Sequence, residues 1–279
     1  MKRLILAILF SLFLSSQTWA GDRVGYWNMD EASGNLTDLS GHGMTLTANG
    51  SPSYQQTGAP NRGKAILFNG TNAYFRSTSI FNDAQGTVSA WINISALPGT
   101  RYGLTSADEA TTNYYISPLR IDSTYKMSFI IYNNGSPYNT ILGSSILQIN
   151  QWYHIVVLST GAEYKIYVNG SLESLTVQQG LNNGAWFSSV SNRDNTVIGA
   201  LRRTSTSFYF SGLIDDVKIY NYALSAIQIQ HEYQQSRLAT QLKYEPWKFM
   251  DLFKLTFFRG DQLDEKDNRI SYLRQRITN

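Results

Sequence analysis

The chain has 279 residues, of which 42% are hydrophobic, 13% aromatic and only 15% charged, and its net charge is +3. This apolar content suffices for one large domain or two small ones, and so small a net charge gives no argument for nucleic acid as a partner. The absence of cysteine excludes disulfides, thiol chemistry and lipid attachment through cysteine.

The first twenty residues have the three parts of a secretion signal. Lys2 and Arg3 form a basic start, Leu4–Leu14 an apolar run, and Ala20 ends a small-residue cleavage site. The apolar run is too short for an ordinary membrane-spanning helix, and an uncleaved anchor is the alternative. We therefore expect residues 1–20 to be a signal peptide and the protein to be secreted, or periplasmic in the cell envelope. Without disulfides, such a protein depends for stability on its core, or on a metal ion as well.

Short runs rich in β-branched and aromatic residues follow one another from residue 24 to residue 220. Asn-Gly, the residue pair that favours tight hairpin turns, punctuates them at 49–50, 69–70, 134–135, 169–170 and 183–184. This spacing predicts an antiparallel β-sandwich. The expected strands are Val24–Met29, a pair within Ala65–Phe75, Thr87–Ser95, Met127–Tyr132, two within Gln151–Leu175, Thr196–Leu201 and Tyr209–Tyr220.

The clearest pattern lies in Gln151–Leu175. Ile155–Leu158 is a continuous apolar run, as a strand covered on both faces requires. The stretch Tyr164–Val168 instead alternates apolar and polar positions, which is the period of a strand. Asn169-Gly170 supplies two residues that accept positive φ and predicts a type I′ turn. The pattern predicts a meander inside a sandwich.

Helical patterning appears only after Asn221, in a short amphipathic segment that reaches about Tyr233 with Ser225 as its N-cap. Residues 234–279 then hold 9 of the 23 Lys and Arg and 6 of the 20 Asp and Glu, with many aromatic residues in Lys243–Phe258. This tail has three interpretations. It docks on the sandwich, it binds a membrane surface or partner, or it is a poorly ordered extension. Docking is favoured because so many aromatic side chains would not stay exposed.

Several motifs in one order resemble laminin-G-like, concanavalin A-like jelly-roll domains. They are Tyr26–Gly43, Ala65–Tyr74, Thr87–Ile92, Trp152–Ile155, Tyr167–Gly170 and Phe210–Ser225. The resemblance implies an all-β fold, an antiparallel two-sheet jelly-roll sandwich over residues 21–233, with a short helix and a C-terminal helical tail at 234–279. It assigns Trp27, Trp91 and Trp152 to packing. This fold carries lectins, adhesion modules, glycosidases and lyases, so function has to be argued from a site.

Acidic residues lie at the first and last predicted strands, which the resemblance makes neighbours. Asp30 ends the first strand, Asp38 follows in the next loop, and Asp216 lies in the last strand. Carboxylate oxygens suit Ca²⁺, and a structural calcium ion would stabilise a protein without disulfides. Alternatively, Asp30 and Asp38 fix turns through bonds to backbone N–H groups. Asp215 points to the opposite face from Asp216, so the predicted ligands are Asp30, Asp38 and Asp216.

No arrangement of residues predicts catalysis. The Glu-x-Asp-x-x-Glu strand that the resemblance would imply for a glycan hydrolase is absent, and in the pairs Asp30-Glu31 and Asp108-Glu109 adjacent side chains diverge. Glycoside hydrolysis needs two carboxyl groups about 5–10 Å apart. Nucleophile-elbow, phosphate-loop and His-Glu-x-x-His motifs are also absent from the sequence. We therefore predict a protein that is not an enzyme.

Aromatic and arginine side chains between the motifs suit carbohydrate, because sugar rings pack on aromatic faces and planar polar groups bond the hydroxyls. Trp186 is the strongest candidate, although an aromatic residue in a sandwich commonly packs in the core. The predicted ligand-binding residues are Trp186, Tyr102, Tyr114, Tyr132, Tyr138, Arg202, Arg203 and Tyr209, with Tyr115 beside them. We expect non-catalytic binding of a glycan or glycosylated surface. The alternatives are an envelope adhesion module that binds a protein through the tail and, third, a glycan-active hydrolase or lyase.

Overall fold

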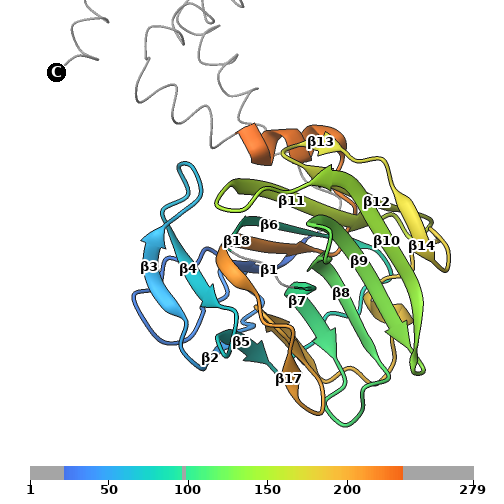
Figure 1. Cartoon of the computed structure of the whole chain (residues 1–279), viewed down its shortest axis with the longest axis horizontal. Coiled ribbons are helices and arrows are strands. Elements are labelled where there is room, and N and C mark those ends of the chain that lie inside the picture. The colour runs from blue at the N-terminus through green and yellow to red at the C-terminus, as the bar shows by residue number, and fades with distance from the viewer. Residues whose placement is uncertain (1–21, 96–98, 235–279) are drawn as a thin grey trace, which may run out of the picture.

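The computed structural model of the protein describes residues 22–95 and 99–234, which form two antiparallel sheets packed against each other (Figure 1). The first sheet has the strand order β13-β12-β11-β6-β18-β4-β3, with β1 also paired to β18. Its strands are β1 (Arg23–Trp27), β3 (Ser53–Thr57), β4 (Lys64–Asn69), β6 (Gly86–Ile94), β11 (Trp152–Ser159), β12 (Tyr164–Val168), β13 (Ser171–Leu172) and β18 (Ser211–Tyr220).

The second sheet has the order β14-β10-β9-β8-β7-β15-β5-β2, and a separate hairpin joins β16 to β17. A 3₁₀ turn, η1, spans Phe187–Ser189. The strands are β2 (Thr47–Asn49), β5 (Tyr74–Ser77), β7 (Arg101–Ala107), β8 (Tyr115–Ile121), β9 (Lys126–Asn133), β10 (Ser136–Ile146), β14 (Thr176–Gln179), β15 (Asn195–Ile198), β16 (Leu201–Arg202) and β17 (Thr206–Ser207). The two-sheet sandwich confirms the predicted fold class.

The main core lies between the sheets and is built by alternation. In β12 the side chains of Tyr164, Ile166 and Val168 face this core, whereas Tyr167 faces the other way. In β11, successive apolar residues face opposite layers: Ile155 enters the main core and Val156 a second cluster on the outer face. The continuous apolar run thus marks a strand that is covered on both faces, as predicted.

The cover on the outer face of the first sheet is the segment after β18. A helix begins at residue 226 and is described as far as residue 234. Leu224 and Ile229 of this segment are buried against Val156 and Leu158 of β11. Ser225 caps the helix as predicted, because its Oγ accepts the Gln228 N–H at 3.3 Å and its own N–H donates to Gln228 Oε1 at 2.7 Å.

The strands β7, β8 and β10 lie in stretches that were not predicted as strands. In these strands the alternation is interrupted, because the pairing register of each one shifts at β-bulges. The turns also differ from one another. Both residues have positive φ at Asn134-Gly135 and Asn169-Gly170, as a type I′ turn requires. Asn69 instead accepts the backbone N–H groups of Thr71, Asn72 and Ala73 with its side-chain oxygen.

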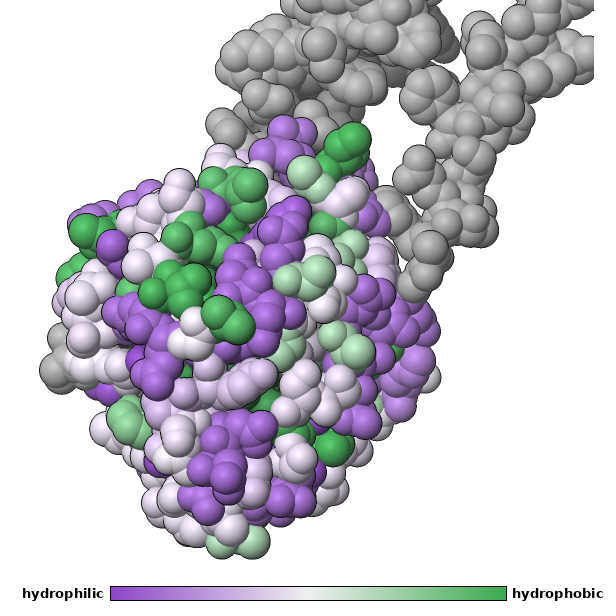
Figure 2. All heavy atoms as spheres, turned by 90° about the vertical axis from the view of Figure 1, so that its right-hand side faces the viewer, coloured by the Kyte–Doolittle hydropathy of each residue, from purple (hydrophilic) through white to green (hydrophobic). Residues whose placement is uncertain are grey.

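The remaining predictions about segments concern other parts of the chain. The predicted signal peptide and all but the first residue of the predicted tail lie outside the described residues. Within the part that the structure describes, no helix has the length and apolar character needed to cross a membrane. Figure 2 shows apolar and hydrophilic side chains interspersed over the side of the sandwich that carries β10 and β14.

Candidate ligand-binding face

Aromatic and arginine side chains gather on the outer face of the second sheet, beside the β16–β17 hairpin. They come from β7, β8, β9 and this hairpin, at positions that alternate with core residues such as Ile116, Ile121 and Ile131. The hairpin lies beside β7, and so brings residues from late in the chain next to residues 102–132. We call the aromatic–arginine face the set Tyr102, Tyr115, Arg120, Tyr132, Arg203 and Phe208.

The rings of this face form one contiguous group. Tyr115 stacks on Tyr132 with centroids 5.0 Å apart and planes 11° apart, and Tyr102 meets Tyr115 edge to face at 6.1 Å. Phe208 packs on Tyr102 at 5.4 Å. Tyr102 and Tyr115 are buried, Tyr132 is half-buried, and Phe208 is 43% exposed. Burial and the neighbouring Tyr102 raise the pKa of Tyr115, so its phenol stays neutral. The face therefore has a buried base and an accessible rim.

Two guanidinium groups lie over these rings. Arg203 lies 5.4 Å from the Tyr115 centroid and Arg120 lies 5.7 Å from the Tyr102 centroid. Arg120 donates to Ser128 Oγ at 2.5 Å and to Thr100 Oγ1 at 3.4 Å, while Arg203 donates to the Thr112 carbonyl at 3.5 Å. These acceptors are neutral, so both charges remain unneutralised by any carboxylate of the described residues.

The best single prediction, Trp186, is wrong as a surface platform. Its side chain has no exposed surface, and its ring stacks on Phe129 with centroids 5.6 Å apart and meets Phe187 at 5.3 Å. Trp186 belongs to the main core between the sheets. Its loop turns inward, and a ligand on the surface would not reach the indole.

The other predicted residues divide between the face and its surroundings. Tyr102, Tyr132 and Arg203 belong to the face, while Tyr114 packs against the main core. Arg202 pairs with Glu109 at 3.5 Å, and Glu109 also pairs with Arg76. Tyr209 packs on Tyr74 at 6.2 Å, and Tyr138 is 46% exposed within β10.

Two members of the face, Phe208 and Arg120, were missed by sequence reasoning. Arg120 follows the run Ile116–Leu119, where a bulge hides the alternation. Phe208 has φ 53°, a conformation that costs a bulky residue about 1–3 kcal/mol and often marks a functional site. The sequence signal that could have identified Phe208 is its position directly after a polar turn and before Tyr209 and Phe210.

The three predicted metal ligands do not form a site together. Asp38 accepts the N–H groups of Tyr26, Ser40 and Met44. Burial alone would raise the pKa of Asp38, but these bonds and one from the Ser40 hydroxyl outweigh it, so the pKa lies below its usual value. Asp216 is paired with two cations, Arg62 at 2.6 Å and Lys218 at 3.1 Å. Both carboxylates are thus used by the protein itself.

Asp215, near Asp30, has a less satisfied carboxyl than the predicted ligands, whereas Asp30 accepts the Lys64 N–H and an Asn28 side-chain N–H, each at 2.7 Å. Within the described residues, no group of three or more His, Cys, Asp or Glu side chains is arranged to hold a metal. However, Asp215 is fully buried, and its Oδ1 atom has no hydrogen-bond partner, while Oδ2 accepts only the Ala59 N–H at 2.9 Å. Burial, with the nearby charges of Asp216 and Asp30, raises the pKa of Asp215 to about 8. Within residues 22–95 and 99–234, no cation forms an ion pair with this carboxyl, although the charge of Arg62 opposes the rise in its pKa.

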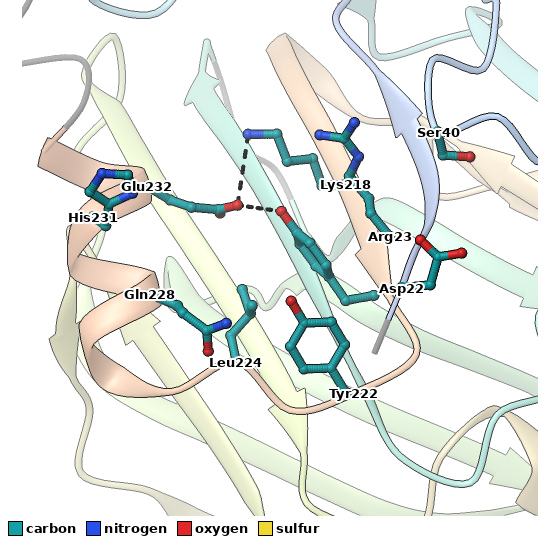
Figure 3. A pocket seen from close by; sticks show the side chains of 10 residues that line it. Asp22, Arg23, Ser40, Lys218, Tyr222, Leu224, Gln228, His231 and Glu232 are labelled. Carbon is teal, nitrogen blue, oxygen red and sulfur yellow. Dashed lines mark hydrogen bonds and ion pairs between the residues drawn. The ribbon is translucent and has the colours of Figure 1, made fainter. Parts of the chain in front are cut away.

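A hollow lies on the first sheet, between β18, the start of β1 and the helix (Figure 3). Its volume is about 480 Å³, and Lys218, Tyr220 and Glu232 are among its lining residues. Figure 3 shows the Glu232 carboxylate directed at Lys218. Glu232 also accepts the Tyr220 hydroxyl and the Ser89 hydroxyl, the latter at 3.0 Å. Because these groups satisfy one another, they hold the helix in place and are less available to a ligand.

Comparison with known proteins places this architecture in a family. Residues 68–230 match the concanavalin A-like lectin/glucanases superfamily. Domain 4 of AbnA, a GH43 extracellular arabinanase from Geobacillus stearothermophilus in complex with arabinotriose, is 22% identical with a TM-score of 0.55, over 76% of this chain and 98% of that one. The binding domain of Paraclostridial Mosquitocidal Protein 1 is 16% identical with a TM-score of 0.55, over 77% of this chain and 52% of that one.

Other similar structures belong to larger proteins. Trypanosoma rangeli sialidase in complex with the inhibitor DANA is 15% identical with a TM-score of 0.51, over 76% of this chain and 32% of that one. At such identities the likeness shows the fold alone, and no curated protein sequence matches this chain. The family match, however, spans more than half of the sequence. The chain therefore belongs to the concanavalin A-like lectin/glucanases superfamily.

Proposed function

We propose that the protein is a non-catalytic carbohydrate-binding module and that the aromatic–arginine face binds the glycan. The observation that carries this proposal is that packed aromatic rings and guanidinium groups lying over them occur together on the outer face of one sheet. The apolar face of a sugar packs on Phe208 and Tyr132, while arginine N–H groups donate to its oxygens. Half-buried rings on a rigid sheet can contact a sugar with little loss of side-chain entropy, because they are already ordered before the sugar binds.

A structure of the same fold supports the proposal. Domain 4 of the Geobacillus arabinanase is described in complex with arabinotriose, and 98% of that domain aligns with this chain. A domain of this architecture thus binds an oligosaccharide.

The carboxylates near the face support the non-catalytic part of the proposal. Glu109 is paired through its Oε1 atom with Arg76 and Arg202. Asp108 is used in a turn, where it accepts the Ala110 N–H and the Thr111 hydroxyl. Glycoside hydrolysis needs one carboxyl that protonates the leaving group and a second on the other side of the bond. Release of reducing or unsaturated sugar ends from a polysaccharide panel would contradict the proposal.

The exposed ring of Phe208 provides the direct test. We expect Phe208→Ala to weaken binding of a glycan identified on a glycan array by about tenfold or more, because burying a Phe side chain contributes about 1.5–3 kcal/mol. Tyr132→Ala is expected to act in the same direction. Isothermal titration calorimetry measures both effects.

A control for these variants is Leu181→Ala, which removes a 67% exposed apolar side chain outside the face. It is expected to bind like the wild type, and the melting temperature of each variant shows that the fold is intact. Unchanged affinity in both Phe208→Ala and Tyr132→Ala would rule out this face as the glycan site. If the full chain binds no glycan but captures an envelope protein only when residues 234–279 are present, the adhesion hypothesis replaces this one.

We also propose that a structural Ca²⁺ ion is held by Asp215 and Asp30, instead of the predicted set with Asp38 and Asp216. Two glycines lie close to these carboxylates. A Cβ atom on Gly58 would lie 2.8 Å from Asp215 Oδ2, and one on Gly63 would lie 2.5 Å from Asp30 Oδ1. A bound cation would neutralise the buried Asp215 carboxylate and supply its missing partner.

Calcium is therefore expected to stabilise the wild-type protein, by about 2.7 kcal/mol at a free concentration roughly 100 times Kd. Differential scanning calorimetry with CaCl₂ or EGTA measures the shift in Tm. Asp215→Asn is expected to abolish this shift, whereas Glu163→Gln, a matched change at an exposed carboxylate, is expected to retain it. An identical Tm with calcium and with EGTA in the wild type would contradict the metal proposal and would not affect the glycan proposal.

A further inference from the structure

We infer that the glycan recognised by the aromatic–arginine face is anionic and carries carboxylate or sulfate groups. This inference rests on the proposed function and adds the chemical class of the ligand. It is argued from the distribution of charge, since the rings of the face suit neutral and charged sugars equally.

The described part of the chain is not basic as a whole. Residues 22–95 and 99–234 contain 12 Lys and Arg against 14 Asp and Glu, a net charge of −2 with neutral histidines. A polyanion would therefore not be attracted to the domain in general. Binding of an anionic glycan requires a local surface on which cations outnumber the carboxylates available to them.

The aromatic–arginine face is such a surface. Buried cations elsewhere are satisfied within the fold: Arg62 and Lys218 pair with Asp216, and Arg193 donates to acceptors that include the Phe81 and Phe187 carbonyls. Arg120 and Arg203 also donate only to hydroxyl or carbonyl oxygens, but unlike the buried Arg193 they are partly exposed. Neither forms an ion pair within the described residues.

The carboxylates nearest to the face are engaged in other contacts. Glu109 is shared by Arg76 and Arg202. Asp108 bonds within its own turn, and Asp194 accepts the Glu109 N–H at 3.1 Å and the Asn195 side-chain N–H at 3.2 Å. The two positive charges of Arg120 and Arg203 thus remain beside the ring pair Tyr102 and Tyr115, and both act on the Tyr115 phenol.

This arrangement matches the geometry of an acidic sugar. A guanidinium group is planar and donates two parallel N–H bonds to a carboxylate or sulfate, and stacking on a ring keeps it in place before the ligand binds. The rings meanwhile contact the C–H face of the same or the next sugar. A neutral sugar would gain the stacking but not the charge-assisted bonds.

The test compares glycans that differ only in charge. For carboxylate, the probes are trigalacturonic acid and its methyl ester. For sulfate, they are 6-sulfo-N-acetyllactosamine and unsulfated N-acetyllactosamine, which is neutral. Affinities of the full chain are measured by isothermal titration calorimetry. We expect the charged member of at least one pair to bind about tenfold or more tightly. The preference is expected to weaken when the salt concentration rises from about 0.05 M to about 0.5 M.

Variants of Arg203 connect the preference to this face. Arg203→Gln is expected to lose about tenfold in affinity for the charged probe and little for the neutral one, and Arg203→Lys is expected to retain part of the preference. Arg120→Gln should act in the same direction. Lys64→Gln removes the same charge from β4 of the other sheet and is the matched control, with an expected loss below about twofold. Melting temperatures verify folding.

The outcomes separate this inference from the proposed function. Equal affinities within both pairs, together with binding of neutral glycans that depends on Phe208, would overturn the anionic class and retain the glycan-binding face. An anionic preference that Arg203→Gln and Lys64→Gln reduce equally would show a general charge effect and would also overturn the inference. Absence of binding to every glycan on the array would overturn both.

Discussion

The variant Trp186→Ala is expected to lower the free energy of unfolding by about 3–5 kcal/mol, because deleting a large buried aromatic side chain loses its contacts and leaves a cavity. Trp186 is fully buried, stacks on Phe129 and meets Phe187, so its partners come from both the second sheet and its own loop. Urea unfolding followed by circular dichroism measures the change. Any loss of glycan binding in this variant would report the damaged core.

Phe208→Ala is the matched control for this prediction. It removes another aromatic side chain, but one that is 43% exposed and held at positive φ, so the expected loss of stability is below about 1 kcal/mol. The two variants should therefore affect different properties: Trp186→Ala lowers the stability of the fold, and Phe208→Ala lowers the affinity for glycan. A Trp186→Ala protein as stable as the wild type would contradict the assignment of this residue to the core.

Glu232→Ala is expected to lower the free energy of unfolding by about 3 kcal/mol at neutral pH. Burial opposes ionisation of Glu232, but contacts with His154, Lys218 and Tyr220 outweigh it and hold its pKa well below the ordinary value of 4.5. Removal of the carboxylate leaves the Ser89 and Tyr220 hydroxyls and the buried His154 without this partner, although Lys218 keeps Asp216. Each buried polar group left unsatisfied costs about 1–3 kcal/mol. The loss falls on the helix, because Glu232 joins it to β6 and β18.

The pH dependence follows from the direction of this shift. A carboxylate whose folded pKa is depressed contributes stability that is complete above its unfolded pKa and is lost as the pH falls toward the folded pKa. The deficit of Glu232→Ala should therefore be largest near neutral pH and should shrink as the pH is lowered below about 4.5. Urea unfolding at several pH values measures it, with Ile227→Ala, at an 82% exposed position of the same helix, as control. A deficit independent of pH would show that the Glu232 charge contributes nothing.

Local patterns were sufficient for much of the fold. The alternation in Tyr164–Val168, the apolar run in Ile155–Leu158 and the Ser225 cap each predicted an element that the structure confirms. In these segments the strand or helix period predicts which side chains are buried from residues a few positions apart, so the sequence pattern and the structure agree. The strands β7 and β8 escaped prediction because bulges shift their register and break the period from which they would be recognised.

The site was predicted only in part, and the comparison of Trp186 with Phe208 shows the reason. Both are aromatic residues in polar, turn-rich stretches, and nothing adjacent in sequence distinguishes them. Phe129, which covers Trp186, lies on β9, more than fifty residues earlier in the chain. Acidic residues raise the same difficulty: Asp38 organises a turn, whereas Asp215 is buried without a partner for one oxygen.

By itself the sequence determined the architecture, because strand period, turn chemistry and helix capping depend on residues a few positions apart. It also determined which residue types a sugar-binding surface would draw upon. Only the tertiary structure decided which aromatic side chains face solvent, which arginines lack a counter-charge and which carboxylates the protein uses for itself. Those properties depend on contacts between strands far apart in the chain, and packing against such neighbours sets both burial and charge balance.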